Sequence, residues 1–163
     1  MLIVALLGMI AIIPKLAIVS DRDVSSPLLN ISSSKQIIFF GFSTCSAVCP
    51  LTLATLARLD NEILENEVQV IFVEIDRHEE NSLADQYAKN FNQHFIGIAP
   101  SEKQLNKLSQ QFMLNIQKSG ESILHQGGLY LVSNHDNQQT LYRTYNVLSF
   151  SLDEITRDIR SES

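Results

Sequence analysis

The spacing of apolar and polar residues changes along the chain. Some segments are continuous apolar runs, which predict strands, and others have apolar residues at helical spacing, which predict helices. Three short runs are rich in β-branched and aromatic residues, as expected of buried strands. These runs are residues 36–42, 68–75 and 95–98. Helical spacing of apolar residues follows each run. The predicted helices are residues 50–66, residues 82–91 and a segment that begins after Pro100 with Ser101 and Gln104 as a capping box.

The last third of the chain predicts a hairpin and a final helix. We expect strands at residues 128–133 and 140–145 around a turn at 134–139, and a helix at 151–160. Strands separated by helices form parallel sheets, and a hairpin adds antiparallel strands. The order therefore predicts an α/β, thioredoxin-like fold, with a central mixed sheet and helices on both faces.

The N-terminal segment has a different composition from the rest of the chain. Met1–Val19 is apolar except for Gly8, Pro14 and Lys15, which approaches the span of a bilayer. We interpret residues 1–19 as a membrane anchor or signal segment, residues 20–34 as a linker and residues 35–163 as the thioredoxin-like domain. A buried N-terminal strand or helix is the alternative for the apolar run.

The charge distribution argues against a nucleic-acid partner. The 12 basic and 18 acidic residues give a net charge of −6, and all the acidic residues follow Ser20. Proteins that bind nucleic acids present a basic stripe, often with interleaved aromatic residues, and none is present in this sequence.

Cys45 and Cys49 are the residues best suited to chemistry. They lie between the first predicted strand and a helix that we expect to start with Pro50, which places Cys49 at its N-cap. The positive end of the helix dipole would lower the pKa of both thiols and favour thiolates. Two thiolates form a soft donor pair for Cu(I) or Zn(II), although a redox pair or a plain disulfide would use the same residues.

A histidine is a reasonable third ligand for such a pair. His78, His94 and His135 lie among polar residues or in a turn, so we interpret them as surface histidines. His125 precedes Gly127 and Gly128 at the entry to an apolar strand, where a loop could present it over the sheet edge. By spacing alone it is either a ligand or an ordinary loop histidine.

Three segments of the chain resemble the Sco/SenC family of copper-binding proteins. Phe40–Pro50 is similar to the family's two-cysteine segment, and Phe72–Asp76 is similar to its hydrophobic strand that ends in Asp. His125 stands five positions ahead of Tyr130-Leu131, like the family histidine. The resemblance covers residues 35–145.

The resemblance implies a function and a location. Members of that family help to assemble the copper centre of cytochrome c oxidase, with the two cysteines and the histidine as metal ligands. For this chain, the resemblance implies a copper ion bound by Cys45, Cys49 and His125. It also implies a copper-bearing oxidase subunit or another copper chaperone as partner, and a domain that faces the periplasm from the bacterial inner membrane.

Several positions depart from the family pattern. Ser43, Ser46 and Leu51 replace common family residues, residues 77–80 replace a Pro and Arg-Asp run, and Leu124 stands where an acidic residue often precedes the histidine. The chain is thus similar to a divergent member. A thiol–disulfide oxidoreductase that uses Cys45 and Cys49 is the alternative to a metallochaperone, and a domain whose cysteine pair merely oxidises is a third interpretation.

Overall fold

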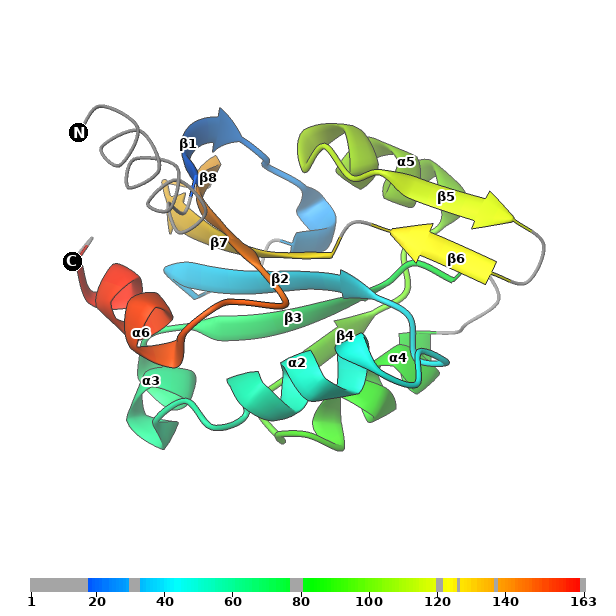
Figure 1. The fold of residues 1–163 in the computed structure, drawn as a ribbon. Coiled ribbons are helices and arrows are strands. Elements are labelled where there is room, and N and C mark those ends of the chain that lie inside the picture. The colour runs from blue at the N-terminus through cyan, green and yellow to red at the C-terminus, as the bar shows by residue number, and fades with distance from the viewer. Residues whose placement is uncertain are drawn as a thin grey trace, which may run out of the picture.

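The described part of the molecule is an α/β domain built on one mixed sheet (Figure 1). The computed structural model describes residues 18–29, 33–76, 81–119, 122–125, 127–136 and 138–161. Its elements are β1 (Ile18–Asp23), the 3-10 helix η2 (Pro27–Leu29), β2 (Lys35–Gly41), α2 (Val48–Leu56), α3 (Asn61–Asn66), β3 (Gln69–Glu74), α4 (Asn81–Lys89), β4 (Ile96–Ile98), α5 (Glu102–Gln111), β5 (Ile116–Ser119), β6 (Ser122–His125), β7 (Gly128–His135), β8 (Gln138–Asn146) and α6 (Leu152–Ser161).

The six-stranded sheet has the order β1-β8-β7-β2-β3-β4. Strands β2, β3 and β4 are parallel, whereas β7 pairs antiparallel with β2 and β8 pairs antiparallel with β7. Helices cover both faces: α5 lies on one side, and α2, α3, α4 and α6 lie on the other (Figure 1). The predicted thioredoxin-like fold, with its parallel part and its C-terminal hairpin, is confirmed.

Strand β2 crosses the middle of the domain and separates two apolar cores. Alternate residues of a strand point to opposite faces, so Ile37 and Phe39 pack on one side and Ile38 and Phe40 on the other. The first core is completed by α2, α3 and α6, and the second by α5 and by Val24 and Leu29. Burial on both faces explains why the sequence of β2 is apolar without alternation.

The predicted helix at residues 50–66 is two helices. Helix α2 ends at Leu56, and α3 starts after Asp60, whose carboxylate accepts a 2.9 Å hydrogen bond from the Glu62 amide. Leu59 is buried in the turn between them, so the apolar spacing continues through a break in the helix. The capping box of Ser101 and Gln104 at the start of α5 is confirmed.

Part of the predicted linker belongs to the domain. Strand β1 pairs with β8, and Val24 and Leu29 are fully buried, so the interpretation of residues 20–34 as a linker is wrong for these positions. The Gln139 side chain holds this segment, because it accepts a hydrogen bond from the Ser26 amide and donates one to the Leu29 carbonyl. Of the predicted anchor, residues 1–17 lie outside the described residues. Within the described ranges, no helix is long and apolar enough to cross a membrane.

Candidate metal centre

The cysteine loop connects the end of β2 to the start of α2. The Cys45 amide donates a 3.0 Å hydrogen bond to the Phe42 carbonyl, which turns the chain after the strand. Helix α2 begins at Val48 with Ala47 as its N-cap, so Cys49 is its second residue rather than the predicted cap. Ala47 has no side chain that could accept a hydrogen bond. The backbone N–H groups of Ala47, Val48 and Cys49, at the start of the helix, point to the Cys45 sulfur instead.

The thiols of Cys45 and Cys49 are close enough for each to shift the pKa of the other, and neither cysteine forms a disulfide. Cys45 is half-buried, whereas Cys49 is completely buried and belongs to the core under α2. Gly41 makes room for the buried sulfur. A Cβ atom at this position would lie 3.0 Å from the Cys49 sulfur and 3.0 Å from the Phe72 ring.

The two thiols have opposite pKa shifts. Burial tends to raise the pKa of Cys45, but hydrogen bonds from the backbone N–H groups of Ala47, Cys49 and Val48 outweigh it, and the pKa of Cys45 is lowered. Burial raises the pKa of Cys49 to about 12. The expectation that both thiols have a lowered pKa is therefore correct for Cys45 and wrong for Cys49. The reason is that the N–H groups at the helix start face only the outer sulfur, that of Cys45.

Glu74 is a functional candidate that sequence reasoning missed. It ends β3, and its carboxylate is buried beside the cysteine loop. One oxygen accepts a 2.9 Å hydrogen bond from the Ser43 amide and the other accepts one of 2.9 Å from the Asp76 amide. Glu74 thus joins the loop after β2 to the loop after β3. An acidic residue at the end of an otherwise apolar strand was the available signal.

The backbone places His125 near the same end of the sheet as the cysteines. His125 is the last residue of β6, paired with Ile116, rather than part of the expected loop, and its side chain lies outside the described part of the structure. Strand β7 starts three residues later, and its Leu129 pairs with Phe39 near the end of β2 that leads to Cys45. The chain therefore returns to the cysteine end of the sheet soon after His125.

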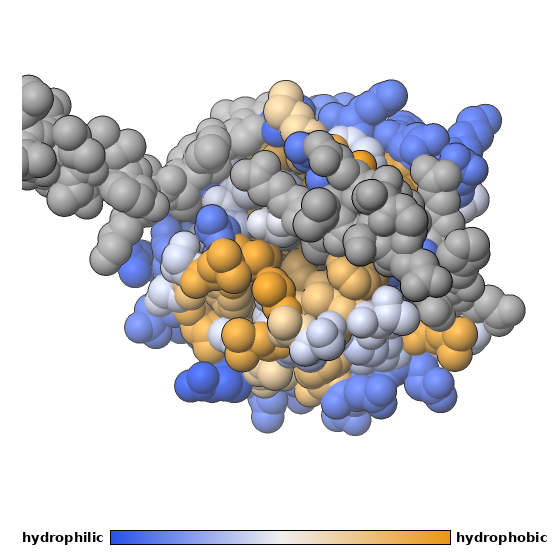
Figure 2. Space-filling model, turned by 45° about the vertical axis from the view of Figure 1, so that its right-hand side comes forward, coloured by the Kyte–Doolittle hydropathy of each residue, from blue (hydrophilic) through white to orange (hydrophobic). Residues whose placement is uncertain are grey.

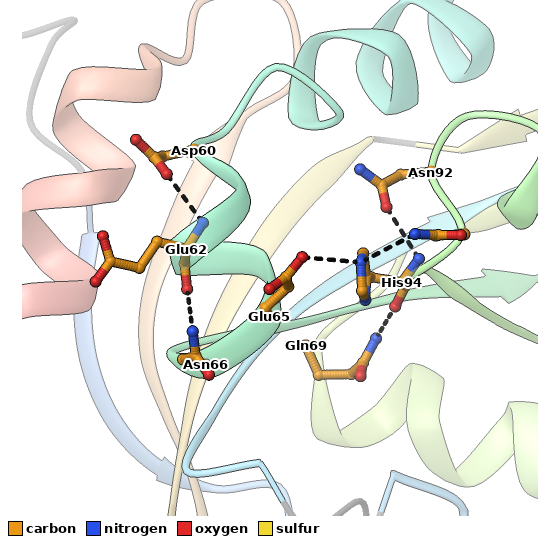
Figure 3. Close-up of polar contacts among 8 residues, drawn as sticks. Asp60, Glu62, Glu65, Asn66, Gln69, Asn92 and His94 are labelled. Carbon is orange, nitrogen blue, oxygen red and sulfur yellow. Dashed lines mark hydrogen bonds and ion pairs between the residues drawn. The ribbon is translucent and has the colours of Figure 1, made fainter.

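Two of the other histidines lie at the opposite end of the sheet. His94 contacts Glu65 at 3.5 Å, and its carbonyl accepts a hydrogen bond from Gln69 at the start of β3 (Figure 3). His135 is exposed at the end of β7 that lies beside the start of β2. Neither histidine can join the cysteines at one ion. His78 lies outside the described residues.

The donor set suits a soft ion. Two adjacent sulfurs, one with a lowered pKa, match the preference of Cu(I) for thiolates. Among the side chains that the structure describes, no third His, Cys, Asp or Glu completes a metal-binding group. A third ligand would therefore come from outside this set, and the backbone position of His125 is compatible with that role.

Exposed apolar side chains lie at the same end of the sheet as the cysteine loop. The Leu51 side chain, in the first turn of α2, is 69% exposed, and that of Leu83, in the first turn of α4, is 48% exposed. Both helices start at the carboxyl ends of parallel strands, so these leucines lie at the same end of the sheet as Cys45. Figure 2, which turns this side of the molecule forward, shows hydrophobic surface gathered there.

The fold and the loop define the class of protein: a thioredoxin-like domain with a free cysteine pair at the start of its first sheet-covering helix. The SCO1/SenC family model matches residues 21–162. The chain therefore belongs to the SCO1/SenC family.

Relatives of known sequence and structure agree with this assignment. The mitochondrial protein SCO1 homolog 1 of Arabidopsis thaliana is 24% identical over 140 residues, which cover 80% of this chain and 42% of that protein. Apo Sco1 of Thermus thermophilus is 26% identical and superposes with a TM-score of 0.66, over 90% of this chain and 92% of that one. Yeast Sco1 with copper bound has 20% identity and a TM-score of 0.63, over 89% and 88% of the two chains.

The chain is shorter than the curated relatives that it matches. It covers 63% of the length of a Stutzerimonas stutzeri relative, which is 28% identical over 129 residues, and 42% of the Arabidopsis protein.

Proposed function

We propose that this protein is a copper-binding metallochaperone that assists assembly of the copper centre of cytochrome c oxidase. The observation that carries the proposal is the pair of free cysteines, Cys45 and Cys49, close together in the loop and first turn of α2 that follow β2. Family membership and the copper-bound Sco1 of yeast support copper as the ion. Cys45 and Cys49 supply thiolates, and His125 supplies the third ligand as an imidazole.

The surroundings of the loop suit transfer to a protein partner. Cys45 is accessible from solvent, while Cys49 is buried, so an incoming ligand meets the outer sulfur first. The exposed leucines Leu51 and Leu83 offer apolar contact area beside it. We propose the copper-bearing oxidase subunit or another copper chaperone as the partner. For the location, we propose the bacterial inner membrane with the domain in the periplasm, anchored through the apolar N-terminal segment.

Copper affinity tests this function directly. We expect the reduced 163-residue chain to bind one Cu(I) in competition with a chelator, and the C45S/C49S double variant to bind none. His125→Ala should weaken binding about tenfold or more, which corresponds to ~1.4 kcal/mol. His135→Ala is the matched control, since this exposed histidine lies at the other end of the sheet. Equal copper binding by the double variant and the unmodified chain would refute the proposal.

The different environments of the cysteines favour a second candidate, a thiol–disulfide oxidoreductase. The Cys45 thiolate would attack a partner disulfide, form a mixed disulfide and release one partner thiolate. Cys49 would then lose its proton and attack the Cys45 sulfur, which forms the Cys45–Cys49 disulfide and releases the second partner thiolate. This exchange does not need His125. Fast disulfide exchange that is unaffected by His125→Ala, together with copper affinity that is also unaffected, would favour this candidate.

A further inference from the structure

Glu74 lies at the edge of the sheet where the cysteine loop begins. It is the last residue of β3, and the parallel register sets it opposite Gly41, the last residue of β2 (Figure 1). The Ile75 amide donates a 2.8 Å hydrogen bond to the Gly41 carbonyl, so the two strands stay paired up to this edge. Phe72, two residues earlier in β3, belongs to the core that contains Cys49. Alternate residues of a strand share a face, so the Glu74 side chain lies on the face of the sheet that α2 covers.

The carboxylate of Glu74 is buried and binds two backbone segments at once. Only 1% of the residue is exposed. Its Oε2 accepts a 2.9 Å hydrogen bond from the Ser43 amide, and its Oε1 accepts one of 2.9 Å from the Asp76 amide. A buried carboxylate is costly unless hydrogen bonds replace its water, and such charge-assisted bonds are strong. An apolar residue would serve the core equally well here, as it does at the preceding positions of β3, so the value of the carboxylate lies in the loops that it joins.

Ser43 is the residue at which the cysteine loop leaves the sheet. It stands two residues before Cys45, whose amide closes the next turn with a 3.0 Å hydrogen bond to the Phe42 carbonyl. Farther along, Ala47 caps α2 without a side-chain hydrogen bond. The bond from Ser43 to Glu74 therefore ties the start of the cysteine loop to a strand that is 31 residues away in the sequence.

Glu74 contacts the loop through its backbone and does not join the cysteines as a ligand. Cys45, Cys49 and Glu74 all lie within the described residues, and their side chains do not form a group that could hold one metal ion. Each carboxylate oxygen is directed at a backbone amide instead. The geometry thus fits a residue that holds the ligand loop in place.

We propose that Glu74 is a positioning residue of the cysteine pair, whose carboxylate holds the Ser43 amide and thereby keeps Cys45 close to Cys49 before any metal ion binds. The inference deepens the proposed copper binding and rests on it for the change in affinity that it predicts. Ligands that are already held in place lose less freedom on binding, and residues that orient ligands commonly change metal affinity about 10- to 100-fold. Without the carboxylate, both thiols remain in the chain but the loop is free to move.

Glu74→Ala tests this inference, with Gln139→Ala as the matched control. The Gln139 side chain is also buried and also holds a distant segment, through the Ser26 amide and the Leu29 carbonyl. Both variants should lower the urea midpoint of the metal-free chain. Only Glu74→Ala should weaken Cu(I) binding in chelator competition, by about tenfold. Unchanged copper affinity in Glu74→Ala, or an equal loss in both variants, would overturn the proposal.

Two measurements on the metal-free chain separate this inference from the proposed function. By NMR, the Ser43 amide should exchange with solvent at least about tenfold faster in Glu74→Ala than in the unmodified chain or in Gln139→Ala. Oxidised glutathione, which is reduced as the Cys45–Cys49 disulfide forms, should show an effective concentration of the two thiols that is about tenfold lower in Glu74→Ala. If the unmodified chain binds no copper, the proposed function fails, and these measurements still decide the inference. Unchanged Ser43 exchange or an unchanged glutathione equilibrium would overturn it.

Glu74→Gln distinguishes the hydrogen bond from the charge. It removes the negative charge but retains an oxygen that can accept the Ser43 amide. Its copper affinity and Ser43 exchange rate should therefore lie closer to those of the unmodified chain than those of Glu74→Ala do. Equal effects in the two variants would assign the effect to the charge and overturn the inference. If Glu74→Ala does not fold, Glu74→Leu, which fills the buried volume without an acceptor, takes its place in every comparison.

Discussion

At the scale of single residues, the two cysteines have different chemical environments although only three residues separate them. The Cys45 sulfur receives N–H groups from the start of α2, which favour its thiolate. The Cys49 sulfur is enclosed by the core beside Phe72, which favours its neutral thiol. A reagent from the solvent therefore meets Cys45 first, and Cys49 reacts only when it loses a proton.

This difference predicts selective alkylation of Cys45. Iodoacetamide reacts with thiolates, so in the reduced, metal-free chain at pH 8 it should modify Cys45 at least tenfold faster than Cys49. The rate at Cys45 should rise with pH and level off below the pH expected for a free thiol, because its pKa is lowered from 9.0. Peptide mass spectrometry over a pH series measures both rates. Equal rates at the two cysteines in the folded chain, as expected after unfolding in urea, would contradict the assigned environments.

At the scale of elements, α4 and β4 pack closer than side chains would ordinarily allow. A Cβ atom at Gly97 of β4 would lie 2.0 Å from the Ala84 carbonyl oxygen, so the backbones are in direct contact. The Gly97 amide also donates a hydrogen bond to Asp85 of α4. Ala84 and Ala88 are therefore the buried residues of this helix. Leu83 of the same helix is 48% exposed, because only small residues fit against the strand.

Gly97→Ala should break this contact. The clash is with backbone atoms that cannot move without displacing the helix, so we expect a loss of unfolding free energy of about 3 kcal/mol or more, or failure to fold. Urea unfolding followed by circular dichroism measures it. Gly128→Ala is the control, because its new Cβ would meet only the outer end of the Tyr130 ring at 3.0 Å. Similar losses in both variants would argue against the backbone contact.

At the scale of the whole molecule, α6 joins the C-terminal part of the chain to the sheet through buried polar contacts. Asp158 accepts the 2.6 Å hydrogen bond from Tyr145 and forms a 3.0 Å ion pair with Arg143, both on β8. The buried Lys35, at the start of β2, donates a hydrogen bond to the Ile159 carbonyl. The Lys35 contact places the C-terminal part of α6 beside the start of β2, the end of this strand away from the cysteine loop.

Asp158→Ala should therefore destabilise the domain without changing copper affinity. Removal of the buried carboxylate leaves Arg143 and Tyr145 without their partner, and we expect a loss of about 3–5 kcal/mol. Urea unfolding of the reduced, metal-free chain measures the change in the free energy of unfolding. Competition with a chelator under native conditions measures the Cu(I) affinity. Arg157→Ala, at an exposed position on the same helix, should stay within about 0.5 kcal/mol of the unmodified chain. A lower copper affinity in Asp158→Ala would show that the contacts of Asp158 with Tyr145 and Arg143 also support the metal centre.

Local patterns in the sequence determine most of the elements and their order. The buried strands β2 and β3 follow from apolar runs, α5 follows from its capping box, and the β7–β8 hairpin follows from two strand patterns around a polar turn. They are predictable because backbone hydrogen bonds and side-chain burial within a few residues decide them. The cysteine pair is also visible in the sequence, since its spacing and its place between a strand and a helix are local facts.

Contacts between distant segments decide the rest. The polar strand β1 forms because β8 offers it an edge, and the break between α2 and α3 lets Leu59 enter the core. The place of Glu74 under the cysteine loop depends on the parallel register of β2 and β3, which sets Gly41 opposite Glu74. The opposite pKa shifts of Cys45 and Cys49 arise in the same way. Spacing along the chain brings the two thiols together, but only the packed structure exposes one sulfur to the helix N–H groups and buries the other, and burial is a property of the whole fold.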